Sequence, residues 1–201
     1  MKAAYAPLLP LLPEIDARLA QGKRTVLAID GPCGSGKTTL AALLARLYDC
    51  PVFHADDFFL RPEQRTPARF AEPGGNLDRE RLLEEVLAPL RQGQPVSFRR
   101  FDCHSLTLLP PVAVAPTPLA VVEGSYSLHP ELAPMYDVSV CLTLSPELQR
   151  RRILARNGEE MARRFFERCI PLEQAYFDAM KPQTRCGFLI EADQLSDEAP
   201  L

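Results

Sequence analysis

The sequence predicts an α/β fold of three layers, in which a mainly parallel central sheet lies between helices on both faces. Two apolar runs without polar alternation, 119–123 and 137–144, are typical of central strands that helices cover on both sides. A third run, 25–30, leads through a glycine-rich segment into an apolar pattern of helical spacing. Strand-like and helix-like segments alternate along most of the 201 residues, which is the order that builds a parallel sheet.

The N-terminal third predicts two helices and two strands. A short helix over 14–22 ends at Gly22, within a proline-rich N-terminal extension of residues 1–22. Strand 25–30 follows, and the helix after it carries leucines at 40, 43, 44 and 47. A second strand covers 51–55. The connection that follows it, as far as Asn76, is long, and long loops often carry function.

The remaining elements complete the sheet and add a small lobe. Apolar residues at helical spacing predict a helix over 78–91, with Asn76 or Asp78 as its cap and Gly93 as its stop. Residues 95–102 predict a short strand and 113–118 a turn, and the two segments together are expected to form a small β lobe. After strands 119–123 and 137–144, Ser145 caps a further helix, and 188–190 supply the last strand.

The glycine-rich segment is a phosphate-binding motif. Residues 31–38 read G-P-C-G-S-G-K-T, which matches G-x-x-x-x-G-K-[ST], and they lie between a strand and a helix as that motif requires. A chance match in a glycine-rich turn would lack these flanks. The loop predicts a bound nucleoside triphosphate, with Lys37 on the β- and γ-phosphates and Thr38 on Mg²⁺. The residues expected to contact the nucleotide are Gly31, Cys33, Gly34, Ser35, Gly36, Lys37, Thr38 and Thr39.

Three carboxylates, Asp30, Asp56 and Glu123, follow predicted strands at the edge of the sheet where ligands bind. Each of them alone could be a turn former or a helix cap. Phosphoryl transfer, however, needs a metal ion on the phosphate oxygens and a group that orients the attacking hydroxyl. Glu123 is therefore the candidate for the Mg²⁺ site together with Thr38, and Asp56 or Asp57 for the hydroxyl.

A basic cluster surrounds residues 157–160 and predicts a short lid. Arginine binds phosphate oxygens with two parallel hydrogen bonds, so a lid rich in arginine suits a phosphate ligand. The alternative is a pair of solvated helices with surface ion pairs. The cluster comprises Arg151, Arg152, Arg156, Arg163, Arg164 and Arg168.

The overall composition indicates which kinds of partner and which cellular compartment to expect. The formal net charge of −3 and the lack of a polybasic run argue against a nucleic-acid partner. No apolar run is long enough for a membrane span, and prolines interrupt the N-terminal segment in a way that does not suit a signal peptide, so a cytoplasmic protein is expected. Six scattered cysteines are expected to be reduced thiols. Cys33, inside the loop, is either a reactive thiol or a small loop filler.

Together these motifs resemble the uridine kinase and phosphoribulokinase family of P-loop kinases, from Arg24 to about Ile190. The resemblance implies a nucleoside-kinase-like P-loop fold as one kinase domain over 1–201, with an acceptor-binding region at 57–118 and a lid at 150–168. The order and spacing of the matching segments are also similar. These segments are 31–39, 56–59, 73–78, 100–105, 121–124 and 151–156.

The same resemblance assigns roles to single residues. Asp56 would be the general base toward a sugar 5′-hydroxyl and would also lie near the metal, while Asp78 would bind ribose hydroxyls. Lys37 with Arg152, Arg156 and Arg164 would complete the catalytic set. An aromatic residue, an acid and a histidine would contact the acceptor together with Phe59, and the matching residues are Phe101, Asp102 and His104.

The expected activity is transfer of a phosphoryl group from ATP, with Mg²⁺, to a small-molecule hydroxyl such as the 5′-hydroxyl of a nucleoside. Uridine kinases usually have Tyr where Phe59 and Phe101 stand, so pantothenate, nicotinamide riboside or another alcohol is an alternative acceptor. A nucleotide-dependent switch is the alternative from a different class, although the chain has no N-K-x-D motif. The sequence leaves open the oligomeric state, a homo-oligomer included.

Overall fold

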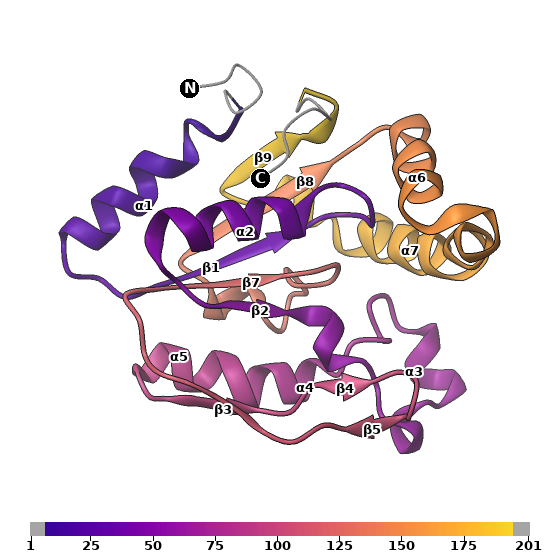
Figure 1. Ribbon diagram of the computed structural model, residues 1–201, viewed down its shortest axis with the longest axis horizontal. Helices are drawn as coiled ribbons and strands as arrows, with labels where there is room; N and C mark the ends of the chain where they lie inside the picture. Colours follow the sequence, from indigo (N-terminus) through magenta and orange to yellow (C-terminus); the bar gives the residue numbers. More distant parts are fainter. Residues whose placement is uncertain (1–6, 195–201) are drawn as a thin grey trace.

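A five-stranded parallel sheet forms the centre of the computed structural model, which describes residues 7–194 (Figure 1). The sheet order is β2-β7-β1-β8-β9, and every neighbouring pair is parallel. This arrangement confirms the predicted α/β fold with a parallel sheet between helices. The strands are β1 (Thr25–Asp30), β2 (Val52–His54), β7 (Leu119–Glu123), β8 (Val138–Thr143) and β9 (Phe188–Glu191).

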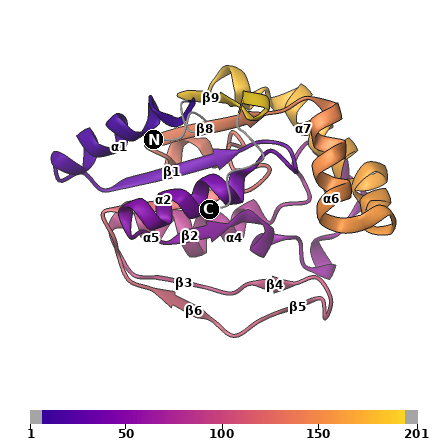
Figure 2. The ribbon, with the colours of Figure 1, turned by 45° about the horizontal axis from the view of Figure 1, so that its top comes forward.

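Two apolar cores cover the two faces of the sheet, because successive side chains of a strand point to opposite sides. From β1, Leu27 and Ile29 pack with α1 (Leu11–Ala20) and α2 (Lys37–Tyr48) on one face. Val26 packs on the other face, with the helical segment of residues 79–92 and with α7 (Ile170–Met180). Figures 1 and 2 show helices on both sides of the strands, as the unbroken apolar runs predicted.

The helices differ from expectation mainly at their ends and in their regularity. Helix α1 begins at Leu11 rather than at residue 14, since Pro13 is tolerated in a first helical turn. The helix predicted over 78–91 is built from α4 (Arg79–Leu82), a π-helical turn (Leu83–Leu87) and α5 (Ala88–Gln92). Short single turns occur at Ala55–Phe58, Pro62–Gln64, Pro67–Ala71 (α3), Ala133–Met135, Pro182–Thr184 and Ala192–Gln194.

The small β lobe projects beside the main sheet (Figure 2). Strand β3 (Val96–Phe98) pairs antiparallel with β6 (Val112–Val114), and β4 (Phe101–Asp102) pairs with β5 (Thr107–Leu108). The turn predicted over 113–118 was therefore wrong at its first two residues. They extend as strand because Val112 and Val114 pack against the buried cluster that holds Val96 and Phe98.

A helical arm, residues 146–169, stands at the carboxyl ends of the strands (Figure 1). Helix α6 (Pro146–Arg164) starts at Ser145, whose hydroxyl accepts a hydrogen bond from Leu148 N, and Gly158 interrupts it with a left-handed φ of 71°. A π-helical turn (Phe165–Cys169) joins α6 to α7. Over residues 7–194, no helix combines the length and the apolar character that crossing a bilayer requires.

Replacing Gly124 by Ala should lower the free energy of unfolding by about 1–3 kcal/mol, because it overpacks a close contact. Gly124 has a φ of 147°, and an added Cβ would lie 2.5 Å from Ala55 Cβ. Urea denaturation would measure the change. Gly187→Ala is the matched control, since its Cβ would meet nothing closer than 3.5 Å. Equal midpoints for the two variants would contradict this prediction.

Candidate active site

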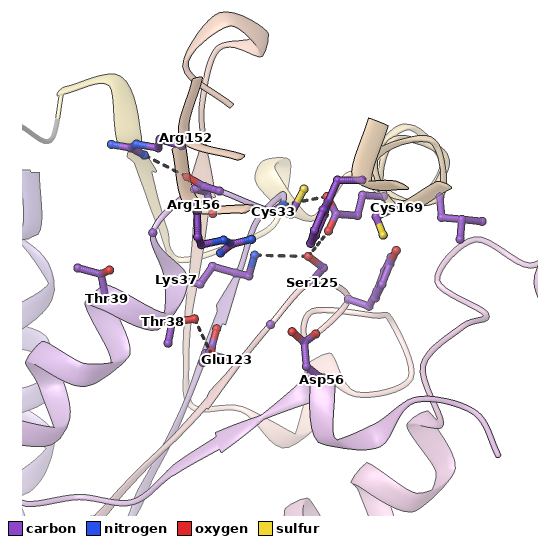
Figure 3. Close-up of a pocket in the computed structure, with 18 of the residues that line it drawn as sticks. Cys33, Lys37, Thr38, Thr39, Asp56, Glu123, Ser125, Arg152, Arg156 and Cys169 are labelled. Carbon is purple, nitrogen blue, oxygen red and sulfur yellow. Dashed lines mark hydrogen bonds between the residues drawn. The ribbon is translucent and has the colours of Figure 1, made fainter. Parts of the chain in front are cut away.

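A cavity of about 820 Å³ lies at the carboxyl edge of the sheet, between the phosphate loop and the arm (Figure 3). Its walls combine the loop residues Cys33 to Thr39, the segment after β2, the end of β7, and side chains of α6 and of the turn after it. A volume of this size is typical of small-molecule sites. The cavity therefore brings together segments that are more than 100 residues apart in the sequence.

The loop adopts a conformation that only glycine accepts easily. Gly34 and Gly36 have φ values of 81° and 95°, in the left-handed region. A Cβ on Gly31 would lie 2.7 Å from the carbonyl oxygen of Leu142, so the loop can approach β8 only without a side chain there. Gly36 leads directly into the N-terminus of α2, where free N–H groups favour an anion.

Lys37 is buried at the base of the cavity and is held by loop carbonyls. Its Nζ donates to the oxygen of Gly31 at 2.8 Å and to that of Pro32 at 3.1 Å, and it lies 3.4 Å from Ser125 Oγ. The ammonium group is thus fixed at the wall that a phosphate on the loop N–H groups would contact.

Thr38 and Glu123 meet across the cavity, as the sequence pattern suggested. Thr38 Oγ1 donates to Glu123 Oε1 at 3.0 Å (Figure 3). These oxygen ligands suit Mg²⁺, which is usually held by one or two carboxylates, water and substrate phosphates. Among residues 7–194 no three His, Cys, Asp or Glu side chains cluster as a metal site. The Thr38 and Glu123 pair therefore fits a metal ion that keeps water and phosphate oxygens among its ligands.

His54, which the sequence left without a role, contacts the same carboxylate. His54 Nδ1 lies 2.6 Å from Glu123 Oε1, and this contact raises the pKa of the histidine. The two residues are register partners on the neighbouring parallel strands β2 and β7. The alternation of a three-residue strand was too short a signal to predict this pairing.

Asp56 is the carboxylate that faces the cavity, and Asp57 is not part of the wall. Asp56 is exposed, but the surrounding protein reduces the solvation of its carboxylate and raises its pKa, while Lys37 opposes this shift. Figure 3 shows Asp56 on one side of Lys37 and Thr39 on the other. A phosphate held by the loop would therefore lie beside Asp56.

The arm supplies arginines to the cavity. Arg152, Arg156, Arg164 and Arg168 line it, whereas Arg151 and Arg163 do not. Arg152 Nη1 donates to the carbonyl oxygen of Gly34 at 3.2 Å, which ties the arm to the loop. Four of the six arginines of the basic cluster thus line the cavity beside the phosphate loop.

Of the acceptor residues that the family resemblance implied, some line the cavity and others lie away from it. Phe59 lines the cavity, but Asp78 and Phe101 are buried elsewhere. Asp78 Oδ1 accepts from Arg81 N at the start of α4, so its carboxylate caps a helix. Asn76, two residues earlier, lines the cavity instead.

Asp102 is the last residue of β4 and His104 lies in the turn to β5, and both are outside the cavity wall. The Asp102 carboxylate accepts hydrogen bonds from His104 N at 2.9 Å and from Ser105 N and Oγ at 3.2 and 2.7 Å. These bonds stabilise the turn and lower the pKa of Asp102. The cavity is instead reached by Cys103, from the same turn.

Cys33 should react with iodoacetamide more slowly than Cys103. Burial raises the pKa of the Cys33 thiol, and the nearby Glu173 carboxylate raises it further. Cys103 is exposed. Because the thiolate is the reactive form, the structure favours the loop-filler interpretation of Cys33. Peptide mass spectrometry after brief labelling would give the order, and modification of Cys33 first would contradict it.

Comparison with curated proteins gives relatives among the kinases. Dephospho-CoA kinase of Jannaschia sp. is 30% identical over 192 residues, which cover 84% of this chain and 89% of that protein. Uridine-cytidine kinase D of Dictyostelium discoideum is 26% identical over 122 residues, 58% of this chain and 23% of that protein. A 45-residue match to the mycobactin import protein IrtA of Mycolicibacterium smegmatis is 56% identical and covers 22% of this chain but only 5% of that protein.

Solved structures share the fold, while no family model matches the chain. A protein of Silicibacter sp. described as a fructose transport system kinase has a TM-score of 0.67 and 23% identity, covering 89% of this chain and 95% of its own. A protein of Bacillus stearothermophilus described as a possible uridine kinase has a TM-score of 0.61 and 23% identity, covering 90% of this chain and 99% of its own. Both likenesses concern the architecture.

Proposed function

Because the chain belongs to the family of P-loop kinases that contains the dephospho-CoA kinases and is related to the uridine kinases, we propose that it transfers the γ-phosphate of ATP to a hydroxyl group beside Asp56. One observation carries this proposal: Lys37, the Thr38 and Glu123 pair, and Asp56 line the same cavity. A donor site and a base for the acceptor are therefore adjacent, as in-line transfer requires.

The donor half consists of the loop and α2. The loop N–H groups and Lys37 would bind the triphosphate, and Thr38 with Glu123 would hold Mg²⁺ against it. When bound, the metal ion neutralises charge on the phosphate oxygens. Arg152, on the arm, already contacts the loop and would add positive charge as the phosphoryl group moves.

The acceptor half is the side of the cavity around Asp56. Asp56 would hold the attacking hydroxyl and accept its proton as the new P–O bond forms. Phe59, Asn76 and Tyr126 line the same cavity and offer ring faces, an amide and a phenol. These groups suit a neutral acceptor with a ring and several hydroxyls. We therefore propose the 5′-hydroxyl of a nucleoside as the first acceptor to test.

A second candidate acceptor is dephospho-CoA. A relative whose match covers 84% of this chain is named a dephospho-CoA kinase. Four arginines line the cavity, namely Arg152, Arg156, Arg164 and Arg168. A basic group there would suit an acceptor that carries phosphate.

An acceptor panel separates these functions. The protein would be incubated with Mg²⁺ and ATP or GTP, together with uridine, cytidine, dephospho-CoA, pantothenate or nicotinamide riboside, and products detected by mass. Phosphorylation of a nucleoside with the highest kcat/KM would support the first acceptor, and that of dephospho-CoA the second. Hydrolysis of ATP without any phosphorylated acceptor would contradict the kinase proposal and favour a nucleotide-dependent switch.

A further inference from the structure

Glu173 is a buried carboxylate that links three parts of the candidate site. It lies on α7, outside every motif of the sequence, and is 6% exposed. Its Oε2 accepts a hydrogen bond from Cys33 N in the phosphate loop at 2.8 Å. Its Oε1 accepts one from Ser125 Oγ, directly after the β7 acid and glycine, at 2.7 Å.

The same contacts connect Glu173 to Lys37. Ser125 Oγ lies 3.4 Å from Lys37 Nζ and 3.1 Å from the Gly31 carbonyl oxygen that Lys37 also contacts. The Ser125 hydroxyl can donate to the carboxylate while it accepts from the ammonium group. The hydroxyl group of Ser125 therefore connects the Glu173 carboxylate to the Lys37 ammonium group.

Anchoring of α7 does not by itself account for this carboxylate. One helical turn further on, Tyr176 donates to Asp30 Oδ2 at 2.7 Å and is fully buried against both the sheet and Tyr126. That contact already attaches α7 to the end of β1. A buried charge is costly unless it is paired, and an apolar side chain would pack in its place. The partners of Glu173 are the loop and, through Ser125, Lys37.

We propose that Glu173 is a positioning residue for phosphoryl transfer, which rests on the proposed function. It fixes the first turn of the phosphate loop through Cys33 and the direction of Lys37 through Ser125. Because α7 continues from the arm that carries Arg152 and Arg164, the same contact fixes the loop relative to the arm. Glu173 also lines the cavity, and its proposed action is through the loop and Lys37 rather than on the transferred group.

The kinetic test is Glu173→Gln, which keeps the shape of the side chain and removes its charge. We expect kcat to fall about tenfold or more, with the Kd of MgATP changed less than threefold, because alignment is lost rather than binding. Glu173→Asp keeps the negative charge on a shorter side chain. Its kcat should be at least threefold higher than that of Glu173→Gln. A kcat of Glu173→Gln within twofold of the parent, or an Asp variant no better than Gln, would overturn the proposal.

Two matched variants separate positioning from folding and from net charge. Tyr176→Phe removes a buried hydrogen bond from the same helix and should lower Tm while leaving kcat within twofold below the melting range. Glu167→Gln removes an exposed charge from the arm and should change neither quantity. If Tyr176→Phe lowers kcat as much as Glu173→Gln does, Glu173 has only a structural role.

Hydrogen exchange tests the contact without any acceptor. In the protein free of nucleotide, amides of peptides covering 31–36 should exchange at least tenfold faster in Glu173→Gln than in the parent or in Tyr176→Phe. Unchanged exchange would overturn the proposed contact. If the acceptor panel is negative but exchange responds, the proposed function fails while the positioning of the loop by Glu173 stands.

Discussion

Replacing Asp56 by Asn should lower kcat for the acceptor by about 10²–10⁴-fold while MgATP still binds, because a positioned general base contributes that much. Asparagine has nearly the same shape, but its amide cannot take the proton of the attacking hydroxyl. Asp56 faces the cavity on the side away from Thr39, so the triphosphate site on the loop is left intact (Figure 3).

The measurement compares kcat from the acceptor assay with the Kd of MgATP from calorimetry. Asp57→Asn is the matched control, since Asp57 is the next residue on the same turn and does not line the cavity. It should keep at least half of the parent kcat. If Asp56→Asn has the kcat of the parent, or if Asp57→Asn loses as much kcat as Asp56→Asn does, Asp56 is not the base.

The donor half of the site could be predicted from the sequence because its signals are local. The loop motif sets the backbone of residues 31–38, and the strands on either side of it are unbroken apolar runs that only a covered sheet explains. Glu123 then follows from strand order alone, since parallel strands end at the same edge. The sequence already predicted that Thr38 and Glu123 would lie together, and the structure adds the distance between them.

The acceptor half could not be predicted in the same way, because it depends on how a long connection folds. Asp78 and Asp102 look like ligands in the sequence, yet each carboxylate accepts nearby backbone N–H groups and stabilises a helix start or a turn. Short polar side chains commonly make such local bonds. Asn76 and Tyr126 reach the cavity through tertiary packing, which no local pattern encodes.

Glu173 and His54 illustrate a second limit. Glu173 stands at a buried position of an otherwise partly apolar helix, and only the approach of the phosphate loop gives its charge a partner. His54 meets Glu123 through strand register. For Glu173 the only signal in the sequence was a polar residue at a position where an apolar one would pack, and that signal does not identify the partner. His54 gave no such signal, since its side chain is 44% exposed.

Replacing Lys37 by Met should lower kcat by about 10²–10³-fold, the usual effect of losing one donor that stabilises charge in a transition state. It should also weaken MgATP binding by about 10-fold or more, because a hydrogen bond from a charged group contributes about 1.5–3 kcal/mol. Methionine keeps an unbranched side chain of similar length, so the buried position stays filled. The Gly31 and Pro32 carbonyl oxygens lose a donor, and a small fall in Tm is expected.

The controls for Lys37 distinguish charge from geometry. Lys37→Arg keeps the charge, but a planar guanidinium is larger than an ammonium group and does not fit between two loop carbonyls, so it should remain at least tenfold below the parent in kcat. Lys23→Met removes an exposed lysine ahead of β1 and should leave kcat and the Kd of MgATP unchanged.

If Lys37→Met binds MgATP and turns over like the parent, the loop does not hold the reacting phosphates, and the cavity must bind its donor in another way. If only kcat falls, Lys37 acts on the transition state alone, and the loop N–H groups account for the affinity.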